Sequence, residues 1–301
     1  MKNYQDVQIT SMPTVKIGEE KLDNLFSNEG GIEWANLIFL TGTSGAGKTT
    51  LCKKIQSLIA DHISVFYSRE MLSSLVKKQT LRLEITHTNA FISDVKDFPH
   101  FNDFMKMIEE RGDVKILILD SIQRIAEDFT KTGMSLEAAM RHIYSVLIEW
   151  KDRTNGIVIL IGQVTKDGDF QGANFLKHDA DAHIHMVFDK NKNTRTIETT
   201  KNRMGKLGKL YYEILDSSET LKFYSEKEFD LKDKKRKFDD YLLNVVVEYI
   251  NSVDKKNPSY PAFKAEAKER MSKVDTTTED AFKITMEMAQ ILNELSKKYD
   301  L

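Results

Sequence analysis

The sequence predicts an α/β protein with a mostly parallel central sheet and a small helical region at its C-terminal end. Strand-like runs alternate with amphipathic helical patterns from Leu37 to about Tyr224, and this alternation is typical of βαβ units. Several of the runs are continuously apolar, as expected of parallel strands whose two faces are both buried. Near residue 226 the pattern changes, because a charge-dense stretch occupies 231–240.

The predicted strands fall into two groups. Helical patterns separate the earlier strands, which favours parallel pairing through crossover connections. The last three strands follow one another without a helix, so this edge of the sheet is predicted to be antiparallel. The strands are expected at 37–41, 63–67, 115–120, 156–162, 183–189, 194–200 and 209–214.

Two helices of the core have sequence signals at their ends. The pattern 135–151 begins at Ser135, a residue type whose hydroxyl caps helix N-termini. The pattern 102–111 ends at Gly112, which suits the left-handed conformation at a helix C-terminus. In the first pattern the apolar positions share one helical face: Met140, Ile143, Leu147 and Trp150.

After residue 226 the chain is expected to form a helical appendage. Pro258 and Pro261 break the chain between two helical patterns, and Thr278 suits the N-cap of the second. The two patterns have apolar stripes at Phe238, Tyr241, Leu242, Val245, Tyr249 and Ile250, and at Phe282, Met286, Ala289, Leu292 and Leu295. The predicted parts of the chain are thus a polar lead-in at 1–36, a core at 37–225 and the appendage at 226–301.

Composition excludes several classes of protein. The formal net charge is only −2, so binding to nucleic acid would need a local basic patch instead of a general positive field. A single cysteine, Cys52, excludes an intrachain disulfide and a cysteine-rich zinc site. The N-terminal residues lack a signal-peptide pattern, and apolar runs are too short to span a bilayer. We therefore expect a soluble, cytoplasmic protein with no membrane partner.

The segment Gly42–Thr49 matches the phosphate-binding pattern G-x-x-x-x-G-K-[ST] at every fixed position. It follows the strand 37–41 and opens the helical pattern of 50–59, which is the context that the motif requires. We expect it to bind ATP, with Lys48 between the β- and γ-phosphates and Thr49 on Mg²⁺. The predicted contacts are Gly42, Thr43, Ser44, Gly45, Ala46, Gly47, Lys48, Thr49 and Thr50.

Three polar residues at strand ends are candidates to complete this site. Asp120 ends the buried strand ILILD and is predicted to help hold Mg²⁺. Glu70 follows the second strand and is a candidate for the group that orients water. Gln163 ends the strand 156–162 and is a candidate sensor of the γ-phosphate. The alternatives are a helix-capping aspartate, a surface glutamate and a strand-end amide.

Together these residues resemble the ATPase core of bacterial RadA (Sms), in the RecA superfamily. The resemblance covers roughly residues 15–224, and its most specific segment is KNRMG at 201–205. The segments VKIGEEKLDNLF, ILILDSIQRI and GQVTKDGDFQGANFLKH are also similar to that family. SREM at 68–71 is more similar to DnaB-type replicative helicases.

The resemblance implies a RecA-like fold with ATP bound between subunits of a homo-oligomeric ring, expected to be a hexamer. It implies that Lys201 and Arg203 reach the γ-phosphate of the neighbouring subunit. It also implies that the loop 166–178 faces single-stranded DNA. The candidate DNA contacts in that loop are Lys166 and Lys177 for phosphates, and Phe170 and Phe175 for bases.

The resulting functional expectation is an ATP-driven motor on single-stranded DNA, acting as a helicase or in branch migration. A filament-forming recombinase or recombination mediator is an alternative, because the same ATP site would serve it. A nucleotide-switched assembly protein similar to KaiC, with no DNA role, is another. The chain lacks the zinc ribbon and the Lon-like domain of bacterial RadA, which suggests a phage or mobile-element protein of the bacterial cytoplasm. Its C-terminal region is then a candidate binding site for a replication or recombination protein.

Overall fold

The computed structural model describes residues 14–83, 85, 87–164, 174–215, 221–233, 235–237, 257–274 and 281–300. The chain divides into two compact units, Met1–Glu226 and Lys227–Leu301. The first unit contains a central sheet with its helices, and the second contains a helical hairpin.

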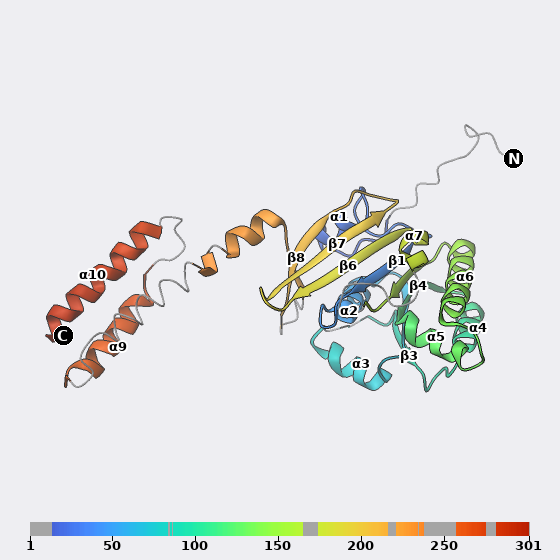
Figure 1. The fold of residues 1–301 in the computed structure, drawn as a ribbon, viewed down its shortest axis with the longest axis horizontal. Helices are drawn as coiled ribbons and strands as arrows, with labels where there is room; N and C mark the ends of the chain where they lie inside the picture. Colours follow the sequence, from blue (N-terminus) through green and yellow to red (C-terminus); the bar gives the residue numbers. More distant parts are fainter. Residues whose placement is uncertain are drawn as a thin grey trace. The chain divides into compact units, whose positions relative to one another are not determined.

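One central sheet organises the first unit (Figure 1). Its strands are β1 (Leu37–Gly42), β2 (Ile63–Ser68), β3 (Ala90–Asp94), β4 (Val114–Asp120), β5 (Ile157–Ile161), β6 (Ala182–Asp189), β7 (Thr194–Asn202), β8 (Lys209–Ile214) and β9 (Leu221–Tyr224). Across the described residues their order is β3-β2-β4-β5-β1-β6-β7-β8-β9. Pairing is parallel from β3 to β6 and antiparallel from β6 to β9. The predicted mostly parallel sheet with an antiparallel edge is therefore confirmed.

Sequence patterning missed the two outermost strands. β3 has five residues, and only its last two are fully buried. β9 has four residues whose burial alternates. Each of these strands has one neighbour in the sheet. Their faces are only partly covered, so no continuous apolar run marks them in the sequence.

Helices cover both faces of the sheet (Figure 1). Their bounds are α1 (Glu20–Phe26), α2 (Lys48–Leu58), α3 (Ser73–Thr80), the 3₁₀ helix η2 (Leu81–Leu83), α4 (Phe101–Arg111), α5 (Ile122–Thr130), α6 (Leu136–Thr154) and α7 (Asn174–Asp179). Residues of α1, α2 and α3 enter the apolar core on one face. Residues of α4, α5, α6 and α7 enter the core on the other. The result is the layered α/β arrangement expected of a mostly parallel sheet.

The two predicted helix caps are confirmed. Ser135 accepts a hydrogen bond from the backbone N–H of Ala138 at 3.2 Å, at the start of α6. Gly112 ends α4 with φ of 71°, and its N–H donates to the carbonyl of Ile108 at 3.2 Å. A side chain at this φ would be strained, which explains why glycine suits the position.

The described part of the lead-in, residues 14–36, packs within the first unit. Val15 and Ile32 form an antiparallel bridge. The carboxylate of Asp23 accepts hydrogen bonds from the N–H groups of Ile17 at 2.8 Å and Gly18 at 3.0 Å. The segment is polar on average, but its apolar side chains are buried in the core: Val15, Ile17, Leu22, Leu25, Phe26 and Ile32.

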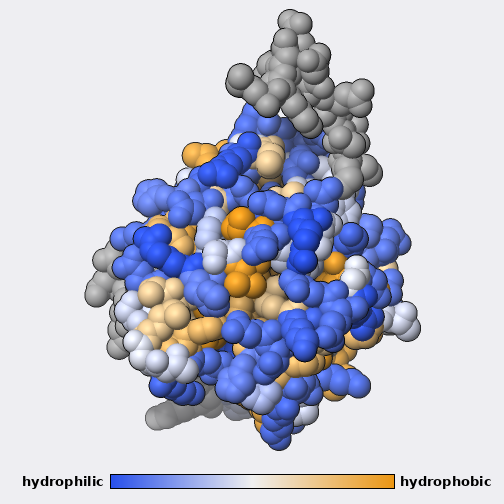
Figure 2. Space-filling view, turned by 90° about the vertical axis from the view of Figure 1, so that its right-hand side faces the viewer, coloured by the Kyte–Doolittle hydropathy of each residue, from blue (hydrophilic) through white to orange (hydrophobic). Residues whose placement is uncertain are grey.

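The surface of the first unit is mostly polar on the face shown in Figure 2, with a small apolar cluster near its centre. No helix in the described part of the chain is long and apolar enough to cross a membrane. The apolar side chains of the parallel strands are instead buried beneath the two helical layers.

In the second unit, α9 (Tyr260–Met271) and α10 (Ala281–Tyr299) form a hairpin. Pro261 lies in the first turn of α9, where its missing N–H would have no partner within the helix. Pro261 therefore starts a helix that the sequence did not predict. Ion pairs join the two helices: Arg270 with Glu294 at 2.7 Å, and Lys298 with Glu266 at 2.6 Å.

The core of the hairpin differs partly from the predicted stripe. Leu292 and Leu295 are buried as expected, but Ala289 is exposed. Further buried residues of the hairpin core are Phe263, Ala267, Val274, Ile284 and Ile291. Residues 226–233 and 235–237 are helical. The predicted stripe at 238–250 and the predicted cap Thr278 lie outside the described residues.

Candidate functional site

The segment Gly42–Thr49 forms the turn between β1 and α2 that its sequence predicts. Gly47 precedes α2 with φ of 94°, a left-handed conformation that favours glycine. A Cβ atom on Gly42 would lie 2.1 Å from the carbonyl oxygen of Met186 in β6. At both positions a side chain is therefore excluded, and the turn stays narrow enough for its N–H groups to face an anion.

Neighbouring strands hold this turn in place. The N–H of Thr43 donates to the carbonyl of Met186 at 3.1 Å. The hydroxyl of Thr43 accepts from the N–H of Phe188 at 2.9 Å. The hydroxyl of Tyr212, on β8, donates to the carbonyl of Ala46. The antiparallel edge of the sheet thus supports the loop, and sequence reasoning did not identify Tyr212.

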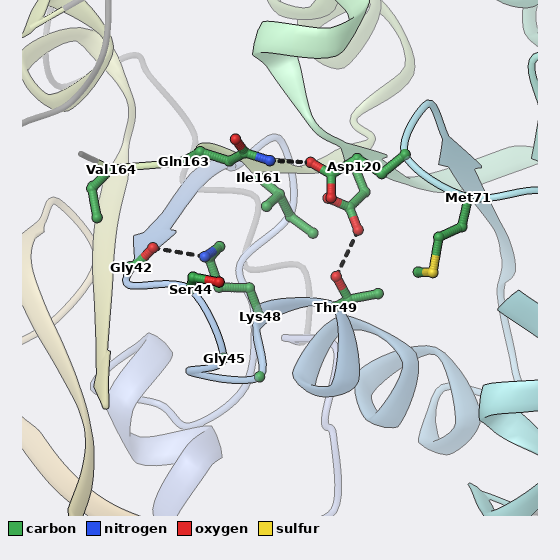
Figure 3. Close-up of a pocket in the computed structure, with 12 residues that line it drawn as sticks. Gly42, Ser44, Gly45, Lys48, Thr49, Met71, Asp120, Ile161, Gln163 and Val164 are labelled. Carbon is green, nitrogen blue, oxygen red and sulfur yellow. Dashed lines mark hydrogen bonds between the residues drawn. The ribbon is translucent and has the colours of Figure 1, made fainter. Parts of the chain in front are cut away.

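Three predicted site residues meet beneath the loop. Figure 3 shows Lys48, Thr49 and Asp120 around one pocket. The hydroxyl of Thr49 donates to Oδ2 of Asp120 at 2.7 Å. Nζ of Lys48 turns back to the carbonyls of Gly42 at 2.7 Å and Thr43 at 3.2 Å. Strand β4 and helix α2 therefore bring together the pair of oxygen ligands that the sequence predicted.

The electrostatics of the site favour a cation. Burial, together with the nearby Glu70 carboxylate, raises the pKa of the Asp120 carboxyl to about 6. Burial lowers the pKa of the Lys48 ammonium, although Asp120 and Glu70 oppose this effect. A hydroxyl beside a buried carboxylate fits Mg²⁺, which takes few protein oxygen ligands and completes its shell with phosphate and water. The residues present therefore fit a magnesium–nucleotide complex.

Glu70 and Gln163 lie side by side although 93 positions separate them in the chain. Nε2 of Gln163 donates to Oε1 of Glu70, and the hydroxyl of Ser121 donates to the same oxygen at 2.9 Å. The side chain of Gln123 fixes the backbone of Gln163 through two hydrogen bonds of 3.0 and 3.2 Å. Ser121 and Gln123 therefore position the candidate catalytic pair, and both belong to the Ser-Ile-Gln that follows Asp120.

The pocket has a volume of about 360 Å³, a size typical of small-ligand sites. Among the predicted contacts, Thr43, Ala46 and Thr50 do not line it. Ala46 is fully buried and supports the loop from behind. The lining residues are Gly42, Ser44, Gly45, Gly47, Lys48, Thr49, Glu70, Met71, Asp120, Ile161, Gln163 and Val164. The apolar members of this lining carry no motif, so sequence reasoning missed them.

Lys201 and Arg203 lie away from this pocket. Lys201 pairs in register with His183 on β6, whereas Gly42 pairs with Met186, three residues further along that strand. The displacement along the strand is about 10 Å, and β6 lies between β1 and β7. Lys201 is therefore at the end of the sheet opposite to the phosphate loop and cannot reach its own pocket.

Contacts within the subunit hold both bases at that end. Nζ of Lys201 donates to the carbonyls of Ala180, at 2.6 Å, and His178. Arg203 forms an ion pair of 2.9 Å with Asp181, whose carboxylate also accepts from the N–H of Leu37 at 2.9 Å. The guanidinium remains about half exposed, so a partner can still approach it.

The candidate DNA contacts are only partly described. Lys166 and Phe170 lie outside the described residues. Lys177 is half-buried on α7. The ring of Phe175 packs edge-on against Tyr144 at 5.8 Å and lies 4.1 Å from the Arg141 guanidinium. Phe175 therefore contacts α6 in this structure, and its stacking on bases stays a prediction.

The core of the chain is similar in sequence to known bacterial proteins. No family model matches the chain. The chain is 26% identical over 196 residues to the DNA repair protein RadA of Aquifex aeolicus, covering 64% of this chain and 42% of that protein. It is 27% identical over 184 residues to the DNA repair protein RadA of Rickettsia felis, covering 60% and 41%. The core of the chain therefore resembles RadA, and the chain spans about two fifths of the length of these relatives.

A solved structure supports the fold. The KaiC-like protein of Pyrococcus horikoshii OT3 superposes with a TM-score of 0.56 at 20% identity, covering 70% of this chain and 99% of that protein. At this level of identity the likeness concerns the fold alone. The expected RecA-like α/β core is therefore confirmed.

Proposed function

We propose that this chain is an ATPase that assembles into a ring and moves along single-stranded DNA in recombination or replication. One observation carries the proposal: the phosphate loop and the bases Lys201 and Arg203 occupy opposite ends of the same sheet. A subunit cannot complete its own site with these bases, but it can offer them to a neighbour. In a head-to-tail arrangement, each phosphate loop faces Lys201 and Arg203 of the neighbouring subunit, which we call the trans finger. If the arrangement closes on itself, it forms a ring in which every site is complete.

Within one subunit, the proposed roles follow from the contacts. Lys48 leaves the carbonyls it contacts in this structure and binds the β- and γ-phosphates. Thr49 and Asp120 hold Mg²⁺, which neutralises phosphate charge when it is bound. Glu70 orients the attacking water and accepts its proton. Gln163 shares a hydrogen bond with Glu70, so loss of the γ-phosphate is transmitted to the chain that follows Val164.

Between subunits, Lys201 and Arg203 are proposed to stabilise the charge that develops on the transferred phosphoryl group. A cation supplied in trans accelerates such reactions by about 10³–10⁵-fold in P-loop enzymes. Arg203 is already oriented by Asp181, and Lys201 by backbone carbonyls. Both groups are therefore pre-positioned, which lowers the entropic cost of binding to a neighbour.

The DNA role rests on two supports. The relatives at 26% and 27% identity are DNA repair proteins by name. The segment between Val164 and α7, which holds the candidate contacts Lys166 and Phe170, starts at the lining of the nucleotide pocket. A change at Gln163 would therefore be passed along the chain to these two candidate contacts. Phosphate contacts by lysine release counterions, so binding should weaken as salt increases.

Steady-state ATP hydrolysis with and without single-stranded DNA tests the proposal. We expect stimulation by DNA that decreases with salt and is lost in Lys201→Ala. Lys206→Ala is the matched control, because Lys206 is an exposed lysine in the loop that follows β7, five residues after Lys201. A rate of hydrolysis that does not change when DNA is added would contradict the proposal. Equal losses of DNA stimulation in Lys201→Ala and Lys206→Ala would also contradict it. A DNA-independent enzyme would instead favour a nucleotide-switched assembly protein.

Electron microscopy with ATP and DNA separates the motor from its closest alternative. Closed rings are expected for the proposed motor. Extended helical filaments would favour a recombinase or mediator, since the same head-to-tail contact produces a filament when the rotation does not close.

A further inference from the structure

A chain of polar side chains crosses the sheet beside the phosphate loop. It starts at Thr41, which directly precedes Gly42 and is completely buried. Oγ1 of Thr41 lies 2.8 Å from Nε2 of His183 and 2.9 Å from Nδ1 of His185, both on β6. Nδ1 of His183 contacts Oγ1 of Thr200 on β7. We call these four residues, Thr41, His183, His185 and Thr200, the polar chain.

Strand register places the polar chain on one face of the sheet. Thr41 pairs with His185, and alternate residues of a strand share a face, so His183 lies on the same side. The register of β6 and β7 shifts between His183 and Ile184, because Thr200 has no opposite residue. Such a bulge re-aims side chains. Here it brings the Thr200 hydroxyl to His183 immediately before Lys201.

Both imidazole rings are neutral near pH 7. Burial, together with the neighbouring His185, Lys177 and Lys201, lowers the pKa of His183 to about 4. Burial lowers the pKa of His185 as well. A neutral ring has one N–H donor and one acceptor nitrogen. The charged groups that face the two rings are Lys48, Lys177, Lys201 and Glu198; the lysines disfavour protonation, and Glu198 opposes them at His185.

The hydrogen bonds of the polar chain can run in two alternative directions. The single hydroxyl proton of Thr41 can be donated to only one of the two rings. If it goes to Nε2 of His183, then His185 donates to Thr41 and Nδ1–H of His183 donates to Thr200. If it goes to Nδ1 of His185, then Nε2–H of His183 donates to Thr41 and Thr200 donates to Nδ1 of His183. His183 is therefore protonated on Nδ1 in the first arrangement and on Nε2 in the second.

The ends of the polar chain touch the two halves of the proposed site. At one end, Thr41 adjoins Gly42, whose carbonyl accepts from Lys48 at 2.7 Å in this structure. A bound triphosphate draws Lys48 away and frees the carbonyl next to Thr41. At the other end, Thr200 adjoins Lys201, whose ammonium is held by Ala180 and His178. Movement of Lys48 beside Thr41 can thus change the hydrogen bond between His183 and Thr200, and with it the position of Lys201.

We propose that His183 is a positioning residue through which nucleotide binding in one subunit sets the placement of Lys201 for the site of the next subunit. The inference rests on the proposed function, because it requires Lys201 to act in trans. Through this route, nucleotide binding at one site controls when Lys201 is placed for hydrolysis at the adjacent site of the ring. The plain alternative is that His183 is a hydrogen-bonded core histidine without a coupling role.

Thr200 offers the cleanest test, because its side chain is exposed and its replacement leaves the core intact. Thr200→Val removes the hydroxyl at nearly constant volume, and Thr200→Ser retains it. We expect Thr200→Val to lower the DNA-stimulated kcat about fivefold, the factor of one ordinary hydrogen bond, with an unchanged KM for ATP. Thr200→Ser should keep wild-type turnover. Equal losses in both variants would overturn the proposal, because the hydroxyl would then not matter.

Lys201→Ala, assayed in parallel, separates the inference from the proposed function. If Lys201→Ala loses stimulation while Thr200→Val behaves as wild type, the coupling role of His183 is wrong and the trans finger stands. If Lys201→Ala itself keeps full stimulation, the proposed function fails at its first step.

Nitrogen NMR of the histidine side chains gives a readout that does not depend on turnover. We expect Mg²⁺ and a non-hydrolysable ATP analogue to exchange the protonated nitrogen of His183 in the wild type but not in Thr200→Val. His183→Gln assigns the signals, and His142 on α6 is an internal reference. An identical His183 tautomer with and without nucleotide would refute the coupling role.

Discussion

Replacing Asp120 with asparagine should stabilise the nucleotide-free protein while it abolishes magnesium-dependent hydrolysis. Asp120 is 2% exposed, accepts one hydrogen bond from Thr49 and lies near the carboxylate of Glu70. Its carboxyl is therefore ionised at a cost to folding. Asparagine keeps the shape of the side chain and removes the charge.

The expected gain follows from the pKa. Burial and Glu70 raise the pKa of Asp120 from 3.8 to about 6. That difference corresponds to at most about 3 kcal/mol of folding stability at pH 7.5. The folded state holds the proton more tightly than the unfolded state, so the cost is absent below pH 3.8 and complete above about pH 6. The gain of Asp120→Asn should therefore disappear as the pH falls towards 4.

Urea unfolding of both proteins at pH 7.5 and pH 4.5 measures this gain. Asp61→Asn is the matched control, because Asp61 is exposed and should give a change near zero. Hydrolysis with Mg²⁺ should be lost only in Asp120→Asn. At pH 4.5 the gain should fall to about 1 kcal/mol, because the unfolded state is then largely ionised and the folded state is not. A variant that is less stable than wild type at pH 7.5, or a gain at pH 4.5 as large as that at pH 7.5, would refute the electrostatic account of the site.

Three further predictions concern the loop and the polar chain. Lys48→Ala should weaken binding of magnesium–ATP at least about tenfold in calorimetry, because it removes the ammonium nearest the phosphates. Gly42→Ala should lower the melting temperature and prevent nucleotide binding, because its Cβ would meet the carbonyl of Met186 at 2.1 Å. The pKa of His183 is lowered from 6.5 to about 4, so wild-type stability should fall as the pH falls through this window, where the unfolded state binds the proton first. His183→Val should flatten that slope in urea unfolding at pH 7 and pH 5.

The parts of the fold that the sequence predicted are those with local signals. Strand, glycine turn and helix occur in immediate succession around Lys48, so the phosphate loop could be placed without tertiary information. The caps Ser135 and Gly112 are also local. The short edge strands β3 and β9 have incomplete burial, and so they leave weak patterns.

The parts of the site that the sequence did not predict depend on distant segments that meet in space. Tyr212 supports the loop from 166 positions away, and nothing in its neighbourhood marks that role. The two hydrogen bonds from the Gln123 side chain to the Gln163 backbone join the start of α5 to the chain just after β5, which only the parallel sheet brings together. The bulge at Thr200 is a register feature, and periodicity cannot detect it.

Mixing two inactive variants tests the central claim most directly. Lys48→Ala has no working phosphate loop but offers an intact Lys201, and Lys201→Ala has the reverse defect. If Lys201 acts on the neighbouring subunit, equal mixing before assembly should restore about a quarter of the wild-type hydrolysis, because that fraction of sites combines a working loop with an intact finger. Hydrolysis no higher than that of the two variants alone would contradict the claim that adjacent subunits build each site together.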